Sequence, residues 1–146
     1  MSLKNCIFRL GLGFLVVLVL AGAPGHPART AGATFDPCSL VLGDPPIDDP
    51  EPTIGGTITN ASTLAGIQGA TVELFQCQSG TGVSGGTTST GSGGAYTFSV
   101  TPGYYYFIQA QTTGPLLNMQ PAQGVNNPSA AHGVGPSIGN VNFAFQ

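Results

Sequence analysis

Charged residues are scarce in this chain, and no lysine or arginine follows position 29. Only 6% of its 146 residues are charged, against about 25% in an ordinary soluble domain. A surface without basic side chains cannot neutralise phosphates, so the sequence argues against a nucleic-acid partner. It argues equally against binding to anionic membrane head groups once the basic N-terminal region has been removed.

Segments suited to helices are also missing. No window places apolar residues at helical spacing, and the strong helix formers Glu, Lys and Arg are few. Tryptophan is absent, whereas glycine and proline are abundant, at 23 and 12 residues. This composition excludes a helical bundle and favours short strands separated by turns.

One apolar run is present, over residues 10–23, and two basic residues precede it. The run is shorter than the roughly 18 residues expected of a spanning helix, and it matches the apolar part of a secretory signal. Two small-residue cleavage sites follow, and the one that ends at Ala33 is preferred because proline follows the other. We predict a signal peptide over residues 1–33 and a protein that is secreted or displayed at the cell surface. An uncleaved membrane anchor is the alternative.

Two of the three cysteines, Cys38 and Cys77, lie beyond the predicted signal peptide. An even pair in an oxidising compartment predicts one disulfide, with two separate thiols as the alternative. Closing a loop of about 40 residues would stabilise the fold by ~3–4 kcal/mol in the chain-entropy description.

Residues 34–52 are predicted to form an acidic, proline-rich linker. Proline removes amide donors and fixes φ, so this stretch suits neither a central strand nor a helix. Asp44, Asp48, Asp49 and Glu51 could offer oxygens to calcium, but their spacing matches no EF-hand loop. We therefore predict no metal site and no cofactor.

From residue 53 onward, apolar and polar residues alternate in short runs that are bounded by turn residues. This pattern predicts an all-β domain over residues 53–146, a single antiparallel β-sandwich of about seven strands. The predicted strands include residues 53–59, 70–77, 87–90, 95–100, 104–112 and 140–146. The predicted core comprises Ile54, Ile58, Val72, Leu74, Tyr96, Phe98, Val100, Val141, Phe143 and Phe145.

Four short motifs follow one another in this region. They are Gly56-Thr-Ile58, Gly69-Ala-Thr-Val-Glu-Leu74, Gly94-Ala-Tyr-Thr-Phe98 and Pro102-Gly-Tyr-Tyr105. In this order they resemble the carboxypeptidase regulatory-like domains, extracellular β-sandwiches of transthyretin-like, carbohydrate-binding-like fold. The ending Gly139-Asn-Val-Asn-Phe143 looks like the last strand of related surface B-type repeats. The resemblance implies a non-enzymatic module that spaces, supports or binds.

The aromatic run Tyr104-Tyr105-Tyr106-Phe107 is the candidate binding site. The resemblance puts Tyr105 inward, which would place Tyr104 and Tyr106 on the outer face of a sheet. Two exposed rings there could stack on a sugar or contact a cell-surface protein. The alternative is that the following segment, especially Leu116, Leu117 and Met119, folds back and covers them.

We therefore predict an extracellular binding module, with carbohydrate or a cell-surface protein as its partner. The alternative is a passive structural or adhesion module without a small-molecule ligand. No catalytic residue is predicted, because His132 is the only histidine beyond the predicted signal peptide and it lies in a Gly- and Pro-rich stretch. A catalytic triad needs histidine held between an acid and a nucleophile.

Overall fold

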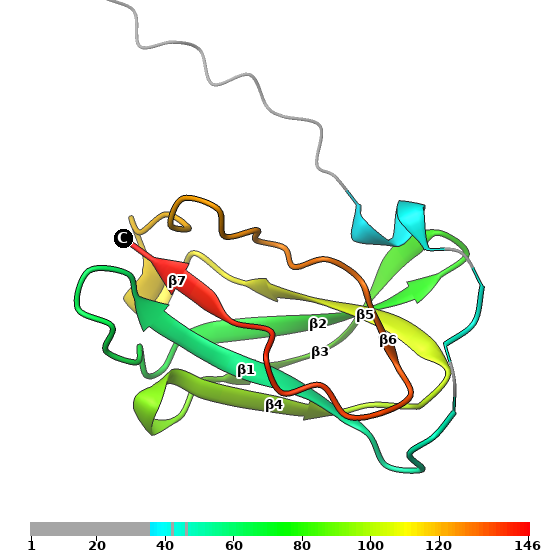
Figure 1. Ribbon diagram of the computed structural model, residues 1–146. Helices are drawn as coiled ribbons and strands as arrows, with labels where there is room; N and C mark the ends of the chain where they lie inside the picture. Colours follow the sequence, from blue (N-terminus) through cyan, green and yellow to red (C-terminus); the bar gives the residue numbers. More distant parts are fainter. Residues whose placement is uncertain (1–35, 42, 46) are drawn as a thin grey trace, which may run out of the picture. The chain divides into compact units, whose positions relative to one another are not determined.

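The computed structural model describes residues 36–41, 43–45 and 47–146. The predicted signal peptide lies outside these residues. Within them, seven strands form two layers (Figure 1). The strands are β1 (Thr53–Asn60), β2 (Thr71–Gln78), β3 (Thr81–Ser89), β4 (Ala95–Ser99), β5 (Tyr104–Ala110), β6 (His132–Val134) and β7 (Phe143–Phe145). Three short 3₁₀ helices accompany them, η1 (Pro37–Leu40), η2 (Ser92–Gly94) and η3 (Gly114–Leu116).

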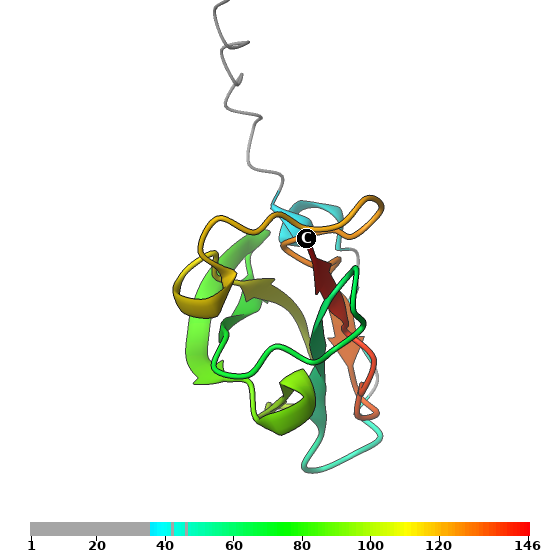
Figure 2. The same ribbon diagram turned by 90° about the vertical axis from the view of Figure 1, so that its left-hand side faces the viewer.

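One sheet has the strand order β4-β1-β7 and the other has the order β3-β2-β5-β6. Figure 2 views the layers after a quarter turn, with β1 and β7 side by side. The predicted all-β sandwich of about seven strands is confirmed. One pairing departs from the predicted antiparallel arrangement, because β7 runs parallel to β1.

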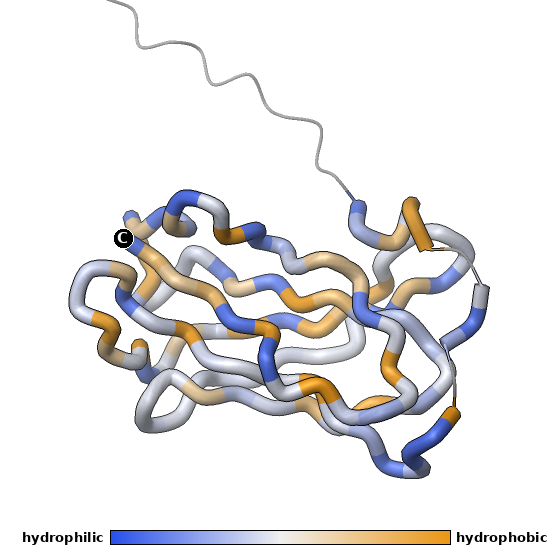
Figure 3. The backbone as a smooth tube through the Cα atoms, in the orientation of Figure 1, coloured by the Kyte–Doolittle hydropathy of each residue, from blue (hydrophilic) through white to orange (hydrophobic). Residues whose placement is uncertain are grey.

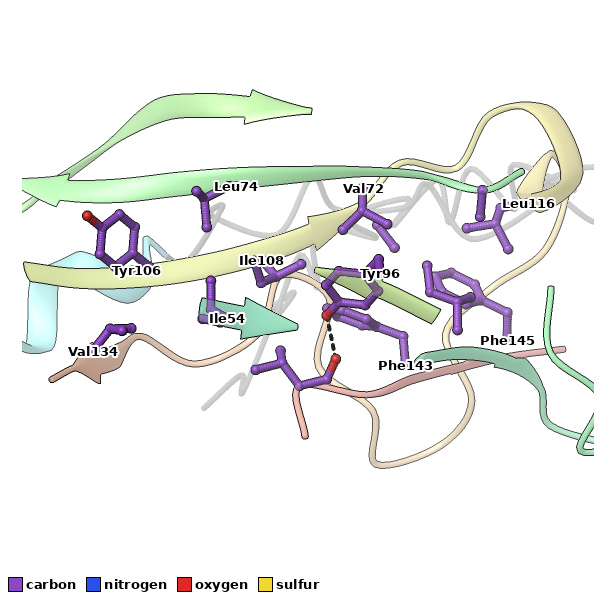
Figure 4. Close-up of a cluster of buried hydrophobic side chains, with 14 residues drawn as sticks. Ile54, Val72, Leu74, Tyr96, Tyr106, Ile108, Leu116, Val134, Phe143 and Phe145 are labelled. Atoms are coloured by element: carbon purple, nitrogen blue, oxygen red, sulfur yellow. Dashed lines mark hydrogen bonds between the residues drawn. The ribbon is translucent and has the colours of Figure 1, made fainter. Parts of the chain in front are cut away.

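The core lies between the two sheets (Figure 4). Eight of the ten predicted core residues are buried there, and the other two, Phe98 and Val100, pack at its margin and are partly buried. Further core side chains come from β5, η3 and β6, which the sequence pattern did not assign to the core. They include Tyr106, Ile108, Ala110, Leu116 and Val134.

The segment that leads into β7 lies along β1, backbone to backbone. Ile138 N–H donates to the carbonyl of Thr53 (2.7 Å), and Gly55 N–H donates to the carbonyl of Ile138 (2.8 Å). Val141 N–H then donates to the carbonyl of Gly55 (3.0 Å). A Cβ at Gly56 would lie 2.0 Å from the carbonyl oxygen of Val141. Glycine at position 56 is therefore required for this close approach.

β3 is longer than the strand predicted at residues 87–90. It spans nine residues, most of them exposed, and its side chains are small or polar. In Figure 3 the strands of the core alternate between orange and blue, which is the pattern that sequence alternation detects. β3 lacks such alternation because neither of its faces is fully buried. A register shift opposite Leu74 and Phe75 marks a β-bulge in this strand.

The stretch predicted as a linker packs against the domain. We call residues 36–52 the lead, of which the structure describes all but residues 42 and 46. Pro37, Cys38, Pro45 and Pro52 are buried. Asp36 begins η1, and its carboxylate accepts a hydrogen bond from Cys38 N–H (2.9 Å). The lead is therefore a folded part of the sandwich rather than a solvated spacer.

Candidate functional site

The aromatic strand β5 faces the core with the opposite parity to the one predicted. Tyr106 and Ile108 point between the sheets, as Figure 4 shows, and Tyr106 is only 4% exposed. Tyr105 lies on the outer face, where a Cβ added at Gly133 of β6 would lie 3.0 Å from its ring. The predicted outward orientation of Tyr106 and inward orientation of Tyr105 are therefore wrong. Because side chains alternate along a strand, Ile108 and Ala110 share the inward side with Tyr106.

The hydroxyl of Tyr106 holds the turn between β4 and β5. It donates to the carbonyl of Thr101 (2.9 Å) and accepts from Thr101 N–H (3.2 Å). Burial raises the pKa of this hydroxyl, because the charged form would lose its water. Tyr106 thus serves the fold, and a platform of two exposed rings is not formed.

Tyr104 is the exposed member of the predicted pair, at 45%. It begins β5 and lines a pocket of about 130 Å³ beside the disulfide. Tyr105 and Asp44 line the same pocket. An aromatic ring and a carboxylate therefore lie at the same small opening. The alternative cover, Leu116, lies in the core instead, so it does not cover Tyr104.

The predicted disulfide between Cys38 and Cys77 is confirmed, with an S–S distance of 1.97 Å and a Cα–Cα distance of 5.3 Å. Cys38 is 1% exposed. Close to the bond, the rings of Phe75 and Phe107 stack at a centroid distance of 4.7 Å. A Cβ at Gly82 would lie 2.5 Å from the Phe107 ring, so glycine there leaves room for this stack.

We call Phe75, Phe107, Cys38 and Cys77 the outer-face cluster. Sequence reasoning predicted only its two cysteines. Phe75 and Phe107 pair directly across β2 and β5, on the face opposite Leu74 and Ile108. The lead covers a face of the sheet that alternation alone would leave to solvent.

A second hollow, the inter-sheet groove, opens between the two layers and has a volume of about 800 Å³. Leu74 and Tyr106 lie at the base of this groove, and Gly85 of β3 lines one side. Ser99, Val100 and the following turn line the opposite side. The lead contributes residues 50–52, including Glu51. Sequence reasoning did not predict this groove, because it arises where two sheets separate.

The acidic residues of the lead lie apart rather than converging. Asp49 accepts hydrogen bonds from Ser137 Oγ (2.9 Å) and from Glu51 N–H (3.0 Å), whereas Asp44 lines the pocket beside the disulfide. Over residues 36–146 as described, no three His, Cys, Asp or Glu side chains gather as a metal site would require. His132 is half-buried in β6, and burial lowers its pKa.

Comparisons with known proteins add little to this geometry. No protein-family model and no curated protein matches the chain. Seven solved chains resemble its structure. One is the pilus 2b backbone protein of group B streptococcus, with 15% identity, a TM-score of 0.46, and coverage of 64% of this chain and 41% of that protein. The chain thus spans less than half of that protein's length.

Two further solved structures are similar at lower scores. The 9R-lipoxygenase of Cyanothece PCC8801 has 11% identity and a TM-score of 0.39, over 71% of this chain and 18% of that protein. The shaft pilin SpaA of Lactobacillus rhamnosus GG has 10% identity and a TM-score of 0.36, over 71% and 50% of the two chains. At these scores the likenesses carry no argument about function. The chain's own topology defines it as a seven-stranded β-sandwich module.

Proposed function

We propose that this chain is a non-enzymatic structural or adhesion module that works outside the cytoplasm. The observation that carries the proposal is the Cys38–Cys77 bond, which fastens the lead to the outer face of the larger sheet. Such bonds form and persist in oxidising compartments, and they stabilise small domains whose cores are limited. The predicted signal peptide agrees with export.

The buried hydroxyl groups also support a structural role, because each holds a turn or a strand. Tyr96 of β4 donates to the carbonyl of Val141 and thereby links β4 to the segment that leads into β7 (Figure 4). Thr90 Oγ1 donates to the carbonyl of Ile67 (2.6 Å) and accepts from Ala70 N–H (2.9 Å). Buried polar groups that are hydrogen-bonded in this way make a fold more rigid.

Cell fractionation combined with thiol labelling tests this role. The protein is expected outside the cytoplasm, with Cys38 and Cys77 blocked to labelling until a reductant is added. It should also resist protease, and the variant with both cysteines changed to alanine should be cleaved faster in the lead. A cytoplasmic protein with two free thiols would contradict the proposal.

A second candidate function is binding of a small carbohydrate at the pocket beside the disulfide. Tyr104 supports it, because this ring is exposed next to a carboxylate. The resemblance to carboxypeptidase regulatory-like domains also agrees with this candidate. On a glycan array, Tyr104→Ala should remove binding, whereas Tyr104→Phe should keep the stacking surface and much of the signal. Binding that is equal in wild type and Tyr104→Ala would reject this site.

A further inference from the structure

Beyond its bulge, the outer edge of β3 carries backbone groups for which no hydrogen-bond partner is found among the described residues. Thr90 N–H donates to the carbonyl of Ala70 (2.9 Å), just beyond the paired part of β3 and β2. Hydrogen-bonding direction alternates along an antiparallel strand, so Thr88 faces β2 while Thr87 and Ser89 face away. Thr87 and Ser89, which follow the bulge and Gly86, therefore direct their N–H and C=O groups away from β2.

Other sheet edges in the described chain are covered or short. Gln120 and Gln146 exchange backbone hydrogen bonds (2.9 and 3.0 Å), and Ala122 N–H donates to the carbonyl of Ala144 (2.8 Å), which covers β7. β6 has only three residues. The first residues of β3 are capped, because Gly82 N–H donates to a carboxylate oxygen of Asp36 (3.2 Å).

Natural proteins usually protect long edge strands with lysine, proline or inward charges. β3 contains none of these between Thr81 and Ser89, and its nine residues make it longer than the other exposed edge, that of β4. Its one protective device is the bulge, which leaves the later residues in regular pairing with β2. This half of the strand is open to a further strand.

The inter-sheet groove opens at the bulge of β3, next to this edge, and Gly85 is the one residue of β3 that lines it. It is lined by Gly85 of β3 and by the apolar side chains of Leu74 and Val100. A strand paired with β3 would direct every second side chain toward the inner side of the sheet. A volume of about 800 Å³ is enough for several such side chains of moderate size.

Carboxylates surround the same edge. Glu73 lies beside it on the outer face and accepts a hydrogen bond from Ser84 Oγ (2.9 Å). Asp36 is at its start and Glu51 at the rim of the groove. Because no lysine or arginine occurs in residues 36–146, these charges have no basic partner on the described chain.

We propose that β3 binds an extended segment of a partner protein in which small apolar residues alternate with basic ones. The backbone of that segment would pair with Thr87 and Ser89, as in β-strand addition to a sheet edge. Its apolar side chains would enter the groove, and its basic side chains, on the opposite face of the segment, would lie near Glu73. A second copy of this chain fits less well, since its own edge brings carboxylates and no basic residue.

The first experiment titrates the disulfide-bonded protein, labelled with ¹⁵N, with a synthetic peptide of alternating lysine and valine. Amide shifts are expected to concentrate in residues 84–89 and around the groove. A peptide with glutamate in place of lysine should bind at least about fivefold more weakly, given like charges at close range. Shifts elsewhere, no shifts, or equal binding of both peptides would overturn the proposal.

Variants then test the contacts. Thr87→Pro removes an outward N–H without removing a bond to β2, and it should weaken binding by about fivefold or more. Glu73→Gln removes the outer-face charge and keeps an oxygen that can accept from Ser84 Oγ, and it should weaken binding by about two- to threefold. Asp44→Asn is the matched control, because it changes the same charge at the separate pocket beside the disulfide, and it should have no effect.

Unfolding of Thr87→Pro would leave Glu73→Gln and the peptide maps to decide the outcome. Equal affinities of Glu73→Gln and Asp44→Asn would overturn the charge complementarity. Sedimentation of the protein as a dimer whose contact maps to residues 84–89 would assign the edge to a second copy and overturn the proposal. Each of these results is distinct from the thiol and protease measurements, which test the structural role.

Discussion

Replacing both Cys38 and Cys77 with alanine is expected to lower the free energy of unfolding by about 4 kcal/mol. The bond closes a loop with a sequence separation of 39, and the chain-entropy relation for this length gives about 4 kcal/mol at 25 °C. The loop contains all of β1 and most of β2, so both sheets are constrained in the unfolded chain. For a domain of about this size, the melting temperature should fall by about 15 °C.

Differential scanning calorimetry and urea unfolding measure the loss. Cys38 is 1% exposed, so alanine also removes some packing around the outer-face cluster. Wild-type protein in thiol reductant separates the two contributions, because reduction opens the loop and keeps both sulfur atoms. A loss below about 1 kcal/mol on reduction would refute the loop argument, and would mean that packing alone holds the lead.

Three further changes test other contacts. Gly82→Ala should destabilise the fold by about 1–3 kcal/mol in urea unfolding, because the added Cβ would meet the Phe107 ring at 2.5 Å; an unchanged midpoint would contradict the packing. Tyr106→Phe should cost about 1–2 kcal/mol, since it removes both hydrogen bonds to Thr101; a loss near zero would count against that role. Burial lowers the pKa of His132, so the folded state takes up a proton less readily than the unfolded chain. Melting temperature should therefore fall as pH falls below about 6.5, and His132→Asn should remove that part of the fall.

Strand positions were predictable wherever one face of a strand is buried and the other is wet. In β1 and β2, apolar residues at every second position lie in the core as predicted. The same signal failed in β3, whose two faces are both largely exposed. It also failed for β6, because three residues are too few to show a period.

The orientation of β5 was missed because four aromatic residues in succession conceal the alternation. The rest of the strand contains the missing signal. Ile108 and Ala110 are apolar, whereas Gln109 is polar, and this places Tyr106 inward by parity. Giving weight to the polar member of the strand would have predicted the buried tyrosine.

The disulfide was predictable, but the packing around it was not. Cys38 and Cys77 are the two cysteines beyond the predicted signal peptide. An even number of cysteines was enough to predict that they form a disulfide. Phe75 alternates with the core residues Val72 and Leu74, so the pattern alone leaves its side chain to solvent. Only the path of the lead shows that this face is covered, and a proline-rich path carries no periodic signal.

The parallel pairing of β1 with β7 also determines when this domain can be completed. Thr53 N–H donates a hydrogen bond to Ser137 Oγ, which lies 84 positions later in the chain. β1 is the central strand of its sheet, so that sheet stays unfinished until the last described residues are available. Contacts so distant in sequence make folding slow. The smaller sheet therefore closes only after β7 has been synthesised, and until then its central strand β1 has a neighbour on one side alone.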